Sequence, residues 1–555
     1  MTTYLGLSNL EPFIWYSHDT SAAIVNEDGV QSAVAEERFN RVKHYAGFPA
    51  GSLDFFSKTY GLEMKDFEAI TLPWSSQPEV PSKLTNNENP SVSIEVLKKR
   101  GKAPKNVFMI SHQTAHAASA FRTSGWKDAL IVCLDGGGLD EGGPSSGALF
   151  LAENFELKRQ VLYGPDASFG SFYGAITEAL GWAYSDGEGK TMGLAPYGDP
   201  LKVRDKLSKF IPTVKGIELE KNEAFYCSFN VCNGRFCVDF SKDPSFQALR
   251  YLISQFGREN VAAAAQVLLE EAVVRLVSNA VERFGIKKVC LSGGVFLNIK
   301  VNKKLREALP SCEFFIHPNP GDGGSAIGAA LEALFIETGK SPKEKMSNAY
   351  LGPEYSNEQI KAELMMFSDK LTFQSVTDAS SEVADLVCDN KVVGWFQGRS
   401  EWGPRALGNR SVLALPNSKQ IKDRINNLLK QRERFMPFAP SILAERASEY
   451  LQNPVASPFM VQGFDAVPEK AGDLGGVNHI DGTVRPQTVE KEENSRFHSL
   501  ISCVESSTGI PAVLNTSFNR HGLPIVERPS DAVQHLVWGC VDALAIGDFI
   551  ATRKK

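Results

Sequence analysis

The chain has 555 residues, a formal net charge of −6, a hydrophobic fraction of 43% and a charged fraction of 22%. This length is too great for one ordinary core and predicts about two to four domains. The composition is typical of a soluble globular protein, and the net charge argues against bulk nucleic-acid binding. No apolar run is long enough to cross a bilayer, no signal peptide is evident, and the nine scattered cysteines fit a reducing compartment. We therefore expect a cytoplasmic protein with neither a membrane nor a nucleic acid as partner.

The first segment predicts a strand at residues 3–8, a polar loop at 18–21, a strand at 22–25 and a returning strand at 30–35. This order, with a polar loop before the second strand, is typical of actin-like, sugar-kinase-like nucleotide folds. Residues 48–60 predict a helix, and residues 77–105 predict an exposed segment rich in Pro, Asn and Lys.

Two histidines lie four residues apart in the next predicted helix. A short strand is predicted at 107–110, and the small residues at 111–120 favour a helix that contains His112 and His116. Two imidazoles at this spacing stand on one helix face and can bind one metal ion. The pattern alone fits equally well two histidines that are hydrogen-bonded inside a packed helix.

Strands followed by glycine-rich turns recur through the first 340 residues. A strand at 129–134 leads to Asp135 and the glycines that follow it. A strand at 289–291 leads to Gly293 and Gly294, and a strand at 315–316 leads to Asp322. Such turns present a metal ligand or bind phosphate. The recurrence predicts two related halves, each a mixed sheet with helices, and the apolar spacing at 260–284 predicts a long core helix.

Two further stretches have a less specific pattern. Residues 186–198 (DGEGKTMGLAPYG) are glycine-rich and are typical of either a flexible loop or a site loop. Cys227, Cys232 and Cys237 are clustered, but their spacing fits no standard zinc pattern, and packing is the favoured interpretation.

A change in composition near 337–357 indicates a surface linker, so we expect one domain at 1–345 and a second at 346–555. In the second domain a buried strand at 392–396 leads into QGRSEWGPRALGNRS, residues 397–411. Glycine permits close backbone approach to a ligand, and arginine offers planar donors to phosphate or carboxylate. The stretch therefore predicts an anion site built from Arg399, Arg405 and Arg410, with Gly398, Gly403 and Gly408 between them. A helix at 421–434 that ends in a basic cluster and a final strand at 543–546 are also predicted.

Taken together, these motifs resemble the O-carbamoyltransferase family, which includes the nodulation-factor, aminoglycoside and cephamycin carbamoyltransferases. The resemblance covers nearly the whole chain. Its carrying segments are HDTSAA (18–23), EERFNRVKH (36–44), SHQTAHAASAF (111–121), GKTMGLAPYG (189–198), LSGGVFLN (291–298), NPGDGGSAIGAA (319–330), QGRSEWGPRALGNRS (397–411), MPFAPS (436–441) and NTSFN (515–519).

The resemblance implies an α/β protein with an actin-like (ASKHA) two-lobed N-terminal domain, at 1–345, and a YrdC-like C-terminal domain, at 346–555. It implies that the second domain condenses carbamoyl phosphate with Mg-ATP to form carbamoyladenylate. The first domain then moves the carbamoyl group to a hydroxyl of a small metabolite. The same resemblance supplies the roles of individual residues.

In the first domain the family pattern makes His112, His116, Asp135 and Asp322 the ligands of a divalent metal, Fe(II) in relatives. His18 matches the general base, Lys43 matches a lysine on carbamoyl or phosphate oxygens, and Asp19 would orient His18 or contact the acceptor. The residues that would line the adenylate are Gly137, Gly293, Gly294 and Asn298. The residues that would hold ATP and carbamoyl phosphate in the second domain are Arg405, Lys430, Arg432, Arg485, Asn515, Ser517 and Asn519.

Two departures from the family pattern are His521, where many relatives carry a basic residue, and a tighter loop at Glu188–Lys190. The acceptor pocket would be built from variable loops near 74–105 and 140–190, so the acceptor stays open, and the chain could form a homodimer. Two other functions remain open: a tRNA-modifying carbamoyl or threonylcarbamoyl transferase, and a nucleotide-regulated scaffold on an actin-like fold.

Overall fold

The computed structural model describes residues 2–8, 18–73, 82–84, 106–140, 143–221, 228–232, 235–240 and 243–554. Within these ranges the chain divides into two compact units, Met1–Met346 and Ser347–Lys555. No helix among the described residues is both long enough and apolar enough to span a membrane. Most of the segment 77–105 and the side chains of Cys227, Cys232 and Cys237 lie outside what is described.

The first sheet of the N-terminal unit has the order β3-β2-β1-β4-β6-β5. An antiparallel meander, β1 to β3, is followed by β4 and β6, which run parallel to β1. Its core strands carry buried aliphatic side chains, which explains why they form the centre of the sheet. The strands are β1 (Tyr4–Ser8), β2 (Ser21–Asn26), β3 (Gly29–Ala35), β4 (Ala69–Leu72), β5 (Ser82–Leu84) and β6 (Asn106–Met109).

The second sheet repeats this order. Read as β9-β8-β7-β14-β15, it has the same antiparallel meander followed by the same two parallel strands. Two copies of one five-stranded arrangement are what an actin-like domain with two lobes requires, so the predicted duplication is confirmed. The strands are β7 (Ala129–Asp140), β8 (Gly143–Glu153), β9 (Glu156–Tyr163), β14 (Lys288–Ser292) and β15 (Glu313–Ile316).

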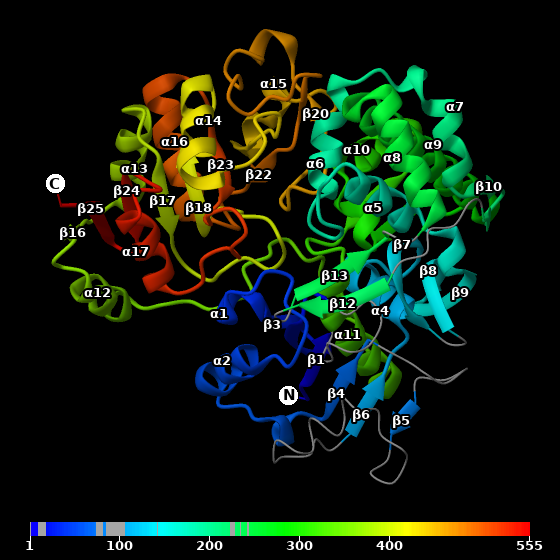
Figure 1. Cartoon of the computed structure of the whole chain (residues 1–555). Helices are drawn as coiled ribbons and strands as arrows, with labels where there is room; N and C mark the ends of the chain where they lie inside the picture. Colours follow the sequence, from blue (N-terminus) through cyan, green and yellow to red (C-terminus); the bar gives the residue numbers. More distant parts are fainter. Residues whose placement is uncertain are drawn as a thin grey trace. The chain divides into compact units, whose positions relative to one another are not determined.

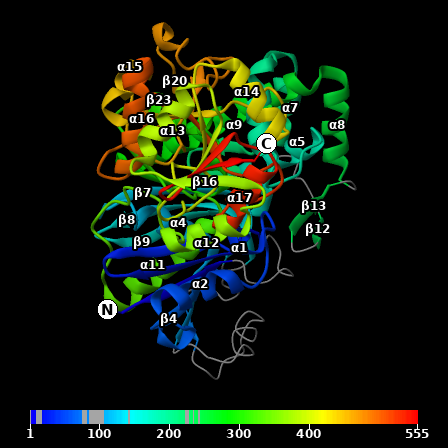
Figure 2. The same cartoon turned by 90° about the vertical axis from the view of Figure 1, so that its left-hand side faces the viewer.

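Two helices are exchanged between the sheets. Helix α4 (His112–Phe121) follows the first sheet but packs on β7 and β14 of the second. Helix α11 (Ser325–Thr338) follows the second sheet but packs on β1, β2 and β4 of the first. The two helices lie side by side between the sheets (Figure 1, Figure 2), which brings the beginnings of both to the same place.

The other helices of this unit pack around the second lobe or on the first sheet. The predicted core helix is α9 (Arg258–Phe284), which ends at Gly285 in the left-handed conformation that favours glycine. Residues 186–198 are not a loop, because most of them form helix α6 (Glu188–Leu194) and a 3-10 turn. The remaining elements are α1 (Glu37–Asn40), α2 (Ala50–Tyr60), α5 (Phe169–Ala179), α7 (Arg204–Leu207), α8 (Pro244–Phe256), α10 (Ile299–Ala308), β10 (Thr213–Lys215), β11 (Glu218–Glu220), β12 (Ser228–Cys232) and β13 (Arg235–Asp239).

The C-terminal unit is an α/β domain on a mixed sheet with the order β16-β25-β24-β17-β18-β23-β19-β22. Helices α13 (Ala379–Cys388) and α16 (Ser495–Thr508) lie side by side (Figure 1, Figure 2). The strands are β16 (Leu371–Ser375), β17 (Val393–Phe396), β18 (Arg410–Ala414), β19 (Ala439–Leu443), β22 (Gln487–Val489), β23 (Ala512–Ser517), β24 (Ala543–Ile546) and β25 (Phe549–Arg553). The short hairpin pairs β20 (Phe464–Asp465) with β21 (Thr483–Val484), and the other helices are α12 (Asn357–Met366), α14 (Lys419–Ile425), α15 (Ala447–Tyr450) and α17 (Pro529–Val537).

Two predicted boundaries in this unit were wrong. The helix expected at 421–434 is α14 followed by one π-helical turn, Asn426–Lys430, and Gln431 in the left-handed region then ends it. Arg432 and Arg434 are therefore outside the helix. The strand at 543–546 is not the last one, because Gly547, with φ of 53°, turns the chain back into β25.

The contact between α4 and α11 leads to a stability prediction. A methyl group added at Gly328 would overlap the backbone carbonyl of Ala115 on α4. Gly328→Ala should therefore lower the free energy of unfolding by about 1–3 kcal/mol, the usual cost of overpacking. Gly189→Ala on α6 is the matched control, since a methyl group there meets nothing within 4 Å. Urea titration checks both variants, and equal stability of the two would contradict the close backbone contact.

Candidate functional site

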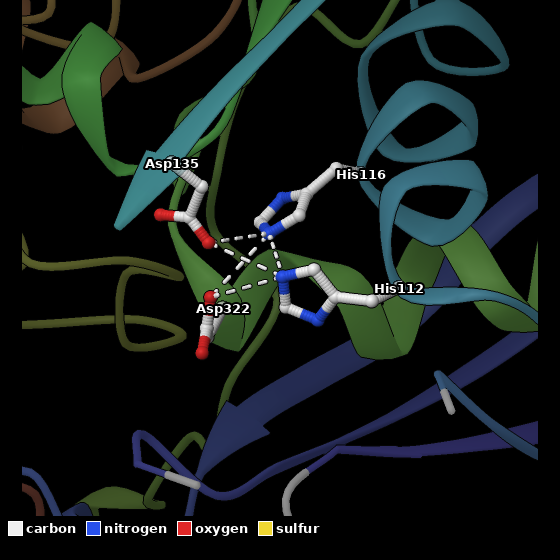
Figure 3. Close-up of side chains that lie close together, drawn as sticks. All are labelled: His112, His116, Asp135 and Asp322. Carbon is white, nitrogen blue, oxygen red and sulfur yellow. Dashed lines mark hydrogen bonds and ion pairs between the residues drawn. The ribbon is translucent and has the colours of Figure 1, made fainter. Parts of the chain in front are cut away.

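Four polar side chains converge where the exchanged helices begin. His112 and His116 project from the first turns of α4, with 3.1 Å between their Nε2 atoms. Asp135, at the break in the register of β7, places Oδ2 3.2 Å from His112 Nε2 and 3.4 Å from His116 Nε2. Asp322, just before α11, places Oδ1 3.8 Å and 3.4 Å from the same two atoms. Figure 3 shows the two carboxylates facing the two imidazoles.

This set fits a divalent cation. One donor atom from each residue lies within 4.8 Å of all the others, and all four residues are buried. An ion bonded to each donor at about 2.1 Å would separate neighbouring donors by about 3.0–3.4 Å, close to the distances observed. Two imidazoles with two carboxylates suit iron, manganese or zinc, so the donors do not select among these metals. The structure thus supports the metal interpretation of the His112 and His116 spacing.

The charges of these four residues also favour a bound cation. Burial of the His116 ring lowers its pKa, but hydrogen bonds to Asp135 and Asp322 and their charges outweigh burial and raise it to about 10. Burial alone would raise the pKa of Asp135, yet the two histidines hold it well below its usual value. Two buried carboxylates therefore need a positive charge at this point, and either a proton or a cation can supply it.

The glycines predicted to line an adenylate lie around Asp135, and one of them contacts it. The amide of Gly294 donates to Asp135 Oδ1 at 3.0 Å, and the amide of Gly293 donates to Pro320 O at 2.7 Å. Gly293 has φ of 94°, and a methyl group there would overlap the backbone of Leu134. Gly137 lies in the same register break of β7 as Asp135.

Asn298 has a structural role. Its Oδ1 caps α10 by accepting the amides of Lys300 and Val301, and its amide group is bonded to Gln266. These contacts fix the position of the Asn298 side chain between α9 and α10.

A chain of alternating acids and bases begins next to the metal set. His18 Nε2 lies 3.7 Å from Asp322 Oδ2, and His18 Nδ1 lies 2.9 Å from Asp19 Oδ2. The other oxygen of Asp19 lies 2.8 Å from His44 Nδ1. The opposite ring nitrogen of His44 lies 3.3 Å from Asp186, which also forms an ion pair with Lys43. The predicted residues His18, Asp19 and Lys43 are thus brought together with one another.

Sequence reasoning missed two members of this chain, His44 and Asp186. His44 ends the charged segment 36–44, and Asp186 opens the glycine-rich stretch 186–198, so both were within motifs already noticed. Burial lowers the pKa of His44, but the charge of Asp19 and the hydrogen bonds to Asp186 and Asp19 raise it to about 10. For His18, burial again lowers the pKa, while the charges of Asp322 and Asp19 raise it to about 9.

Three guanidinium groups come together in the C-terminal unit. Burial lowers the pKa of Arg405 and of Arg432 to about 10; at Arg432 the charge of Glu433 opposes this shift and the charge of Arg405 adds to it. Burial lowers the pKa of Arg485 well below its usual value, helped by the charges of Arg405 and Arg432. Among the described residues no carboxylate pairs with any of the three, and the buried Nε atom of each has no hydrogen-bond partner. Such an excess of positive charge can bind a polyanion.

Four other residues predicted for ATP and carbamoyl phosphate organise this site. Lys430 Nζ donates to the side chains and carbonyls of Ser517 and Asn519, which ties the NTSFN segment to the π-helical turn. Asn515 donates to Ala406 O at 3.2 Å, next to Arg405, and to Ser441 Oγ at 2.9 Å. The buried Oδ1 of Asn515 has no partner among the described residues, so it is the atom of this group that stays available to a ligand.

The expectation that all three arginines of 397–411 bind an anion was wrong for two of them. Arg410 is fully buried, donates to four backbone carbonyls and stacks on Phe396. Arg399 donates to the carbonyls of Leu351 and Gly352. The backbone amides of the stretch are also engaged, because Glu401 Oε1 accepts those of Leu407, Asn409 and Arg410. Of the three, Arg405 forms neither a hydrogen bond nor an ion pair with the described residues, so it is the one that we expect to hold a ligand.

The raised pKa of His116 predicts how metal binding depends on pH. Below about pH 10 the ion-free set carries a proton that a divalent ion must displace, because only a neutral imidazole is a ligand. Affinity should therefore rise with pH, about tenfold for each pH unit between about pH 6 and pH 8. Calorimetric titration with Mn²⁺ checks this slope. His116→Ala should weaken the binding of Mn²⁺, because it removes one of the four donors, and His498→Gln, in the other unit, should leave both the affinity and its slope unchanged. A flat affinity in the wild-type chain would contradict the proposed proton displacement.

Comparison with known proteins follows the division into two units. The family model described as carbamoyltransferase N-terminus matches residues 82–331, and the model described as carbamoyltransferase C-terminus matches residues 384–553. The nodulation protein NolNO of Sinorhizobium fredii is 33% identical and covers 97% of this chain and 79% of its own length. The nodulation protein NolO of Bradyrhizobium diazoefficiens is 35% identical over 80% of this chain and 79% of its own length. An uncharacterized protein of Methanocaldococcus jannaschii is 32% identical over 97% of this chain and 98% of its own length. The chain therefore belongs to the carbamoyltransferase family.

Proposed function

We propose that this carbamoyltransferase is ATP-dependent, has two active sites, and transfers its carbamoyl group to a hydroxyl of a small metabolite. In the proposed first step carbamoyl phosphate is hydrolysed to carbamate and phosphate, and carbamate attacks ATP to give carbamoyladenylate and pyrophosphate. In the second step the acceptor hydroxyl attacks the carbamoyl carbon, and AMP leaves. The observation that carries the proposal is that each unit holds one charged site. One unit has the carboxylate–imidazole set, and the other has three guanidiniums whose buried Nε atoms have no partner among the described residues.

The C-terminal unit would carry out the first step, as a YrdC-like activating domain. ATP and carbamoyl phosphate repel each other, and the guanidiniums of Arg405, Arg432 and Arg485 would offset that repulsion. The same groups would stabilise the charge that develops on the departing pyrophosphate. Lys430, Ser517 and Asn519 would keep the NTSFN segment in place, and Asn515 Oδ1 would accept a hydrogen bond from the carbamate amino group.

The N-terminal unit would carry out the second step. His112, His116, Asp135 and Asp322 would hold the divalent ion, which we propose is Fe(II). When bound, the ion would supply Lewis-acid polarisation of the carbamoyl carbonyl and would offset the charge of Asp322. The charge of Asp322 is the first of the causes that raise the pKa of His18, so with that charge offset the ring would be neutral and would accept the proton of the acceptor hydroxyl at Nε2, while Asp19 holds the ring through Nδ1. Lys43 would contact the carbamoyl or phosphate oxygens.

Substitution of Arg405 tests the activation step. Arg405→Ala should stop the release of pyrophosphate from ATP and carbamoyl phosphate, because it removes one of three charges that hold two polyanions. Release of AMP from supplied carbamoyladenylate should persist, with water as the acceptor. The matched control is Arg446→Ala, a partly exposed arginine of the same unit that is paired with Glu449 and Glu505. Equal loss of both half-reactions in Arg405→Ala would overturn the division of labour.

Substitution of His18 tests the transfer step in the opposite way. His18→Ala should leave pyrophosphate release intact and slow the release of AMP from carbamoyladenylate by about 100- to 10,000-fold, the range for loss of a general base. Normal release of AMP by this variant would remove His18 from the role of base. Metal analysis of protein purified without oxygen tests the assignment of iron, and a screen of hydroxylated metabolites for a gain of one carbamoyl mass would identify the acceptor.

A further inference from the structure

The chain of acids and bases beside the metal set joins the two lobes of the N-terminal unit. Lys43 and His44 follow the meander of the first sheet, whereas Asp186 lies between α5 and α6 of the second lobe. One oxygen of Asp186 contacts both the ammonium group of Lys43 and Nε2 of His44. These side chains are only partly exposed, with 29% for Lys43 and 26% for Asp186, so solvent screens the contacts incompletely.

The segment that carries Asp186 is held firmly in the second lobe. Ser185 has φ of 64°, and its amide donates to Glu188 Oε1 at 2.8 Å at the start of α6. The amide of Tyr184 donates to Glu178 Oε2 at 2.8 Å at the end of α5. The ring of Tyr184 packs against Gly174, and its hydroxyl lies against Gly136, next to the metal-set residue Asp135. These contacts tie the turn that carries Asp186 to α5, to α6 and to Gly136, the neighbour of Asp135.

The first-lobe partners are held in an equally specific way. His44 and Asp19 both have left-handed backbone conformations, with φ of 55° and 58°. Such conformations cost energy for residues other than glycine and persist only where surrounding contacts enforce them. The His44 amide donates to Glu37 Oε2 at 2.9 Å, and the two oxygens of Asp19 are shared between His44 and His18. A displacement of His44 would consequently move Asp19 and, through it, His18.

We infer that Asp186 is a positioning residue that latches the first lobe onto the second through Lys43 and His44 and thereby sets the place of His18 beside the metal site. Lys43 and His18 approach the reacting carbamoyl group from the first lobe. His112 and His116 lie on α4, which packs on the second sheet, and Asp135 lies on β7 of that sheet. The two sets share one reaction centre only while the lobes keep a fixed separation. The inference rests on the proposed function of this site.

A second cation site is the competing interpretation of the same cluster. Asp19, Glu37 and His44 have donor atoms within 4.8 Å of one another. However, both oxygens of Asp19 already contact imidazoles, and Glu37 accepts the amide of His44. The cluster is therefore satisfied by its own members, and the contacts of Asp186 with Lys43 and His44 add a polar bridge between the lobes to the packing of α4 against α11.

The test compares Asp186→Asn and Asp186→Ala with Asp199→Asn. Asp199 is an exposed residue of the same lobe whose side chain caps a 3-10 turn, and asparagine caps equally well, so this control makes the same charge change without touching the latch. In both Asp186 variants we expect kcat for AMP release from supplied carbamoyladenylate, with water as acceptor, to fall about 10- to 100-fold, as for other residues that position reactive groups. The KM for ATP and the rate of pyrophosphate release should stay at the wild-type values. An unchanged kcat, or an equal loss of pyrophosphate release, would overturn the inference.

A second measurement does not depend on turnover. Spin labels introduced through non-natural amino acids at Lys58 in the first lobe and Lys158 in the second, both exposed, report the distance between the lobes. The distance distribution should broaden in Asp186→Ala and stay unchanged in Asp199→Asn. Identical distributions in wild type and Asp186→Ala would refute the latch whatever the activity. A wild-type chain that releases no AMP would instead refute the proposed function, and the label distances would still decide the latch.

Discussion

Two buried carboxylates, Asp135 on β7 and Asp322 after β15, reach the same point from two strands of the second sheet. Buried charge of one sign is unfavourable unless a compensating charge lies within contact distance. Much of the surrounding architecture serves this requirement. The exchange of α4 and α11 delivers His112 and His116 to the carboxylates, the Gly294 amide orients Asp135, and glycines allow the backbones of α4, α11 and the sheet to approach closely.

The C-terminal unit has the reverse imbalance. Burial lowers the pKa of all three arginines; the charge of Arg405 adds to this at Arg432, where the charge of Glu433 opposes it, and the charges of Arg405 and Arg432 add to it at Arg485. In each unit, then, folding leaves an excess of charge that a ligand of opposite sign can neutralise. A cation can do so in the N-terminal unit, and a phosphorylated substrate can do so in the C-terminal unit. This complementarity is a property of the two sites taken separately and needs no assumption about how the units are arranged.

Patterns of short range predicted the fold and part of the site well. The strands, the duplicated halves and the helix with His112 and His116 follow from apolar runs, glycine turns and a spacing of four. What sequence could not reveal was which polar groups are already engaged. Arg399 and Arg410 look like Arg405 in the sequence, but their donors are taken by carbonyls of residues 351–353 and of the stretch itself. Likewise, the role of Asp186 depends on its contacts with His44 and Lys43, which lie 142 and 143 positions earlier in the chain. The π-helical turn that places Arg432 outside the helix could not be predicted from the sequence either, because its residues have ordinary helix propensities.

The exchange of helices also has a consequence for folding. The first sheet cannot cover its apolar face until α11 has been synthesised, although its strands are complete some two hundred residues earlier, and α4 in turn waits for β7 and β14. The lobes consequently depend on each other for a complete core, and contacts so distant in sequence close slowly. We expect the two halves to form one cooperative folding unit, so that a ribosome-bound chain ending before residue 325 would expose the surface that α11 later covers.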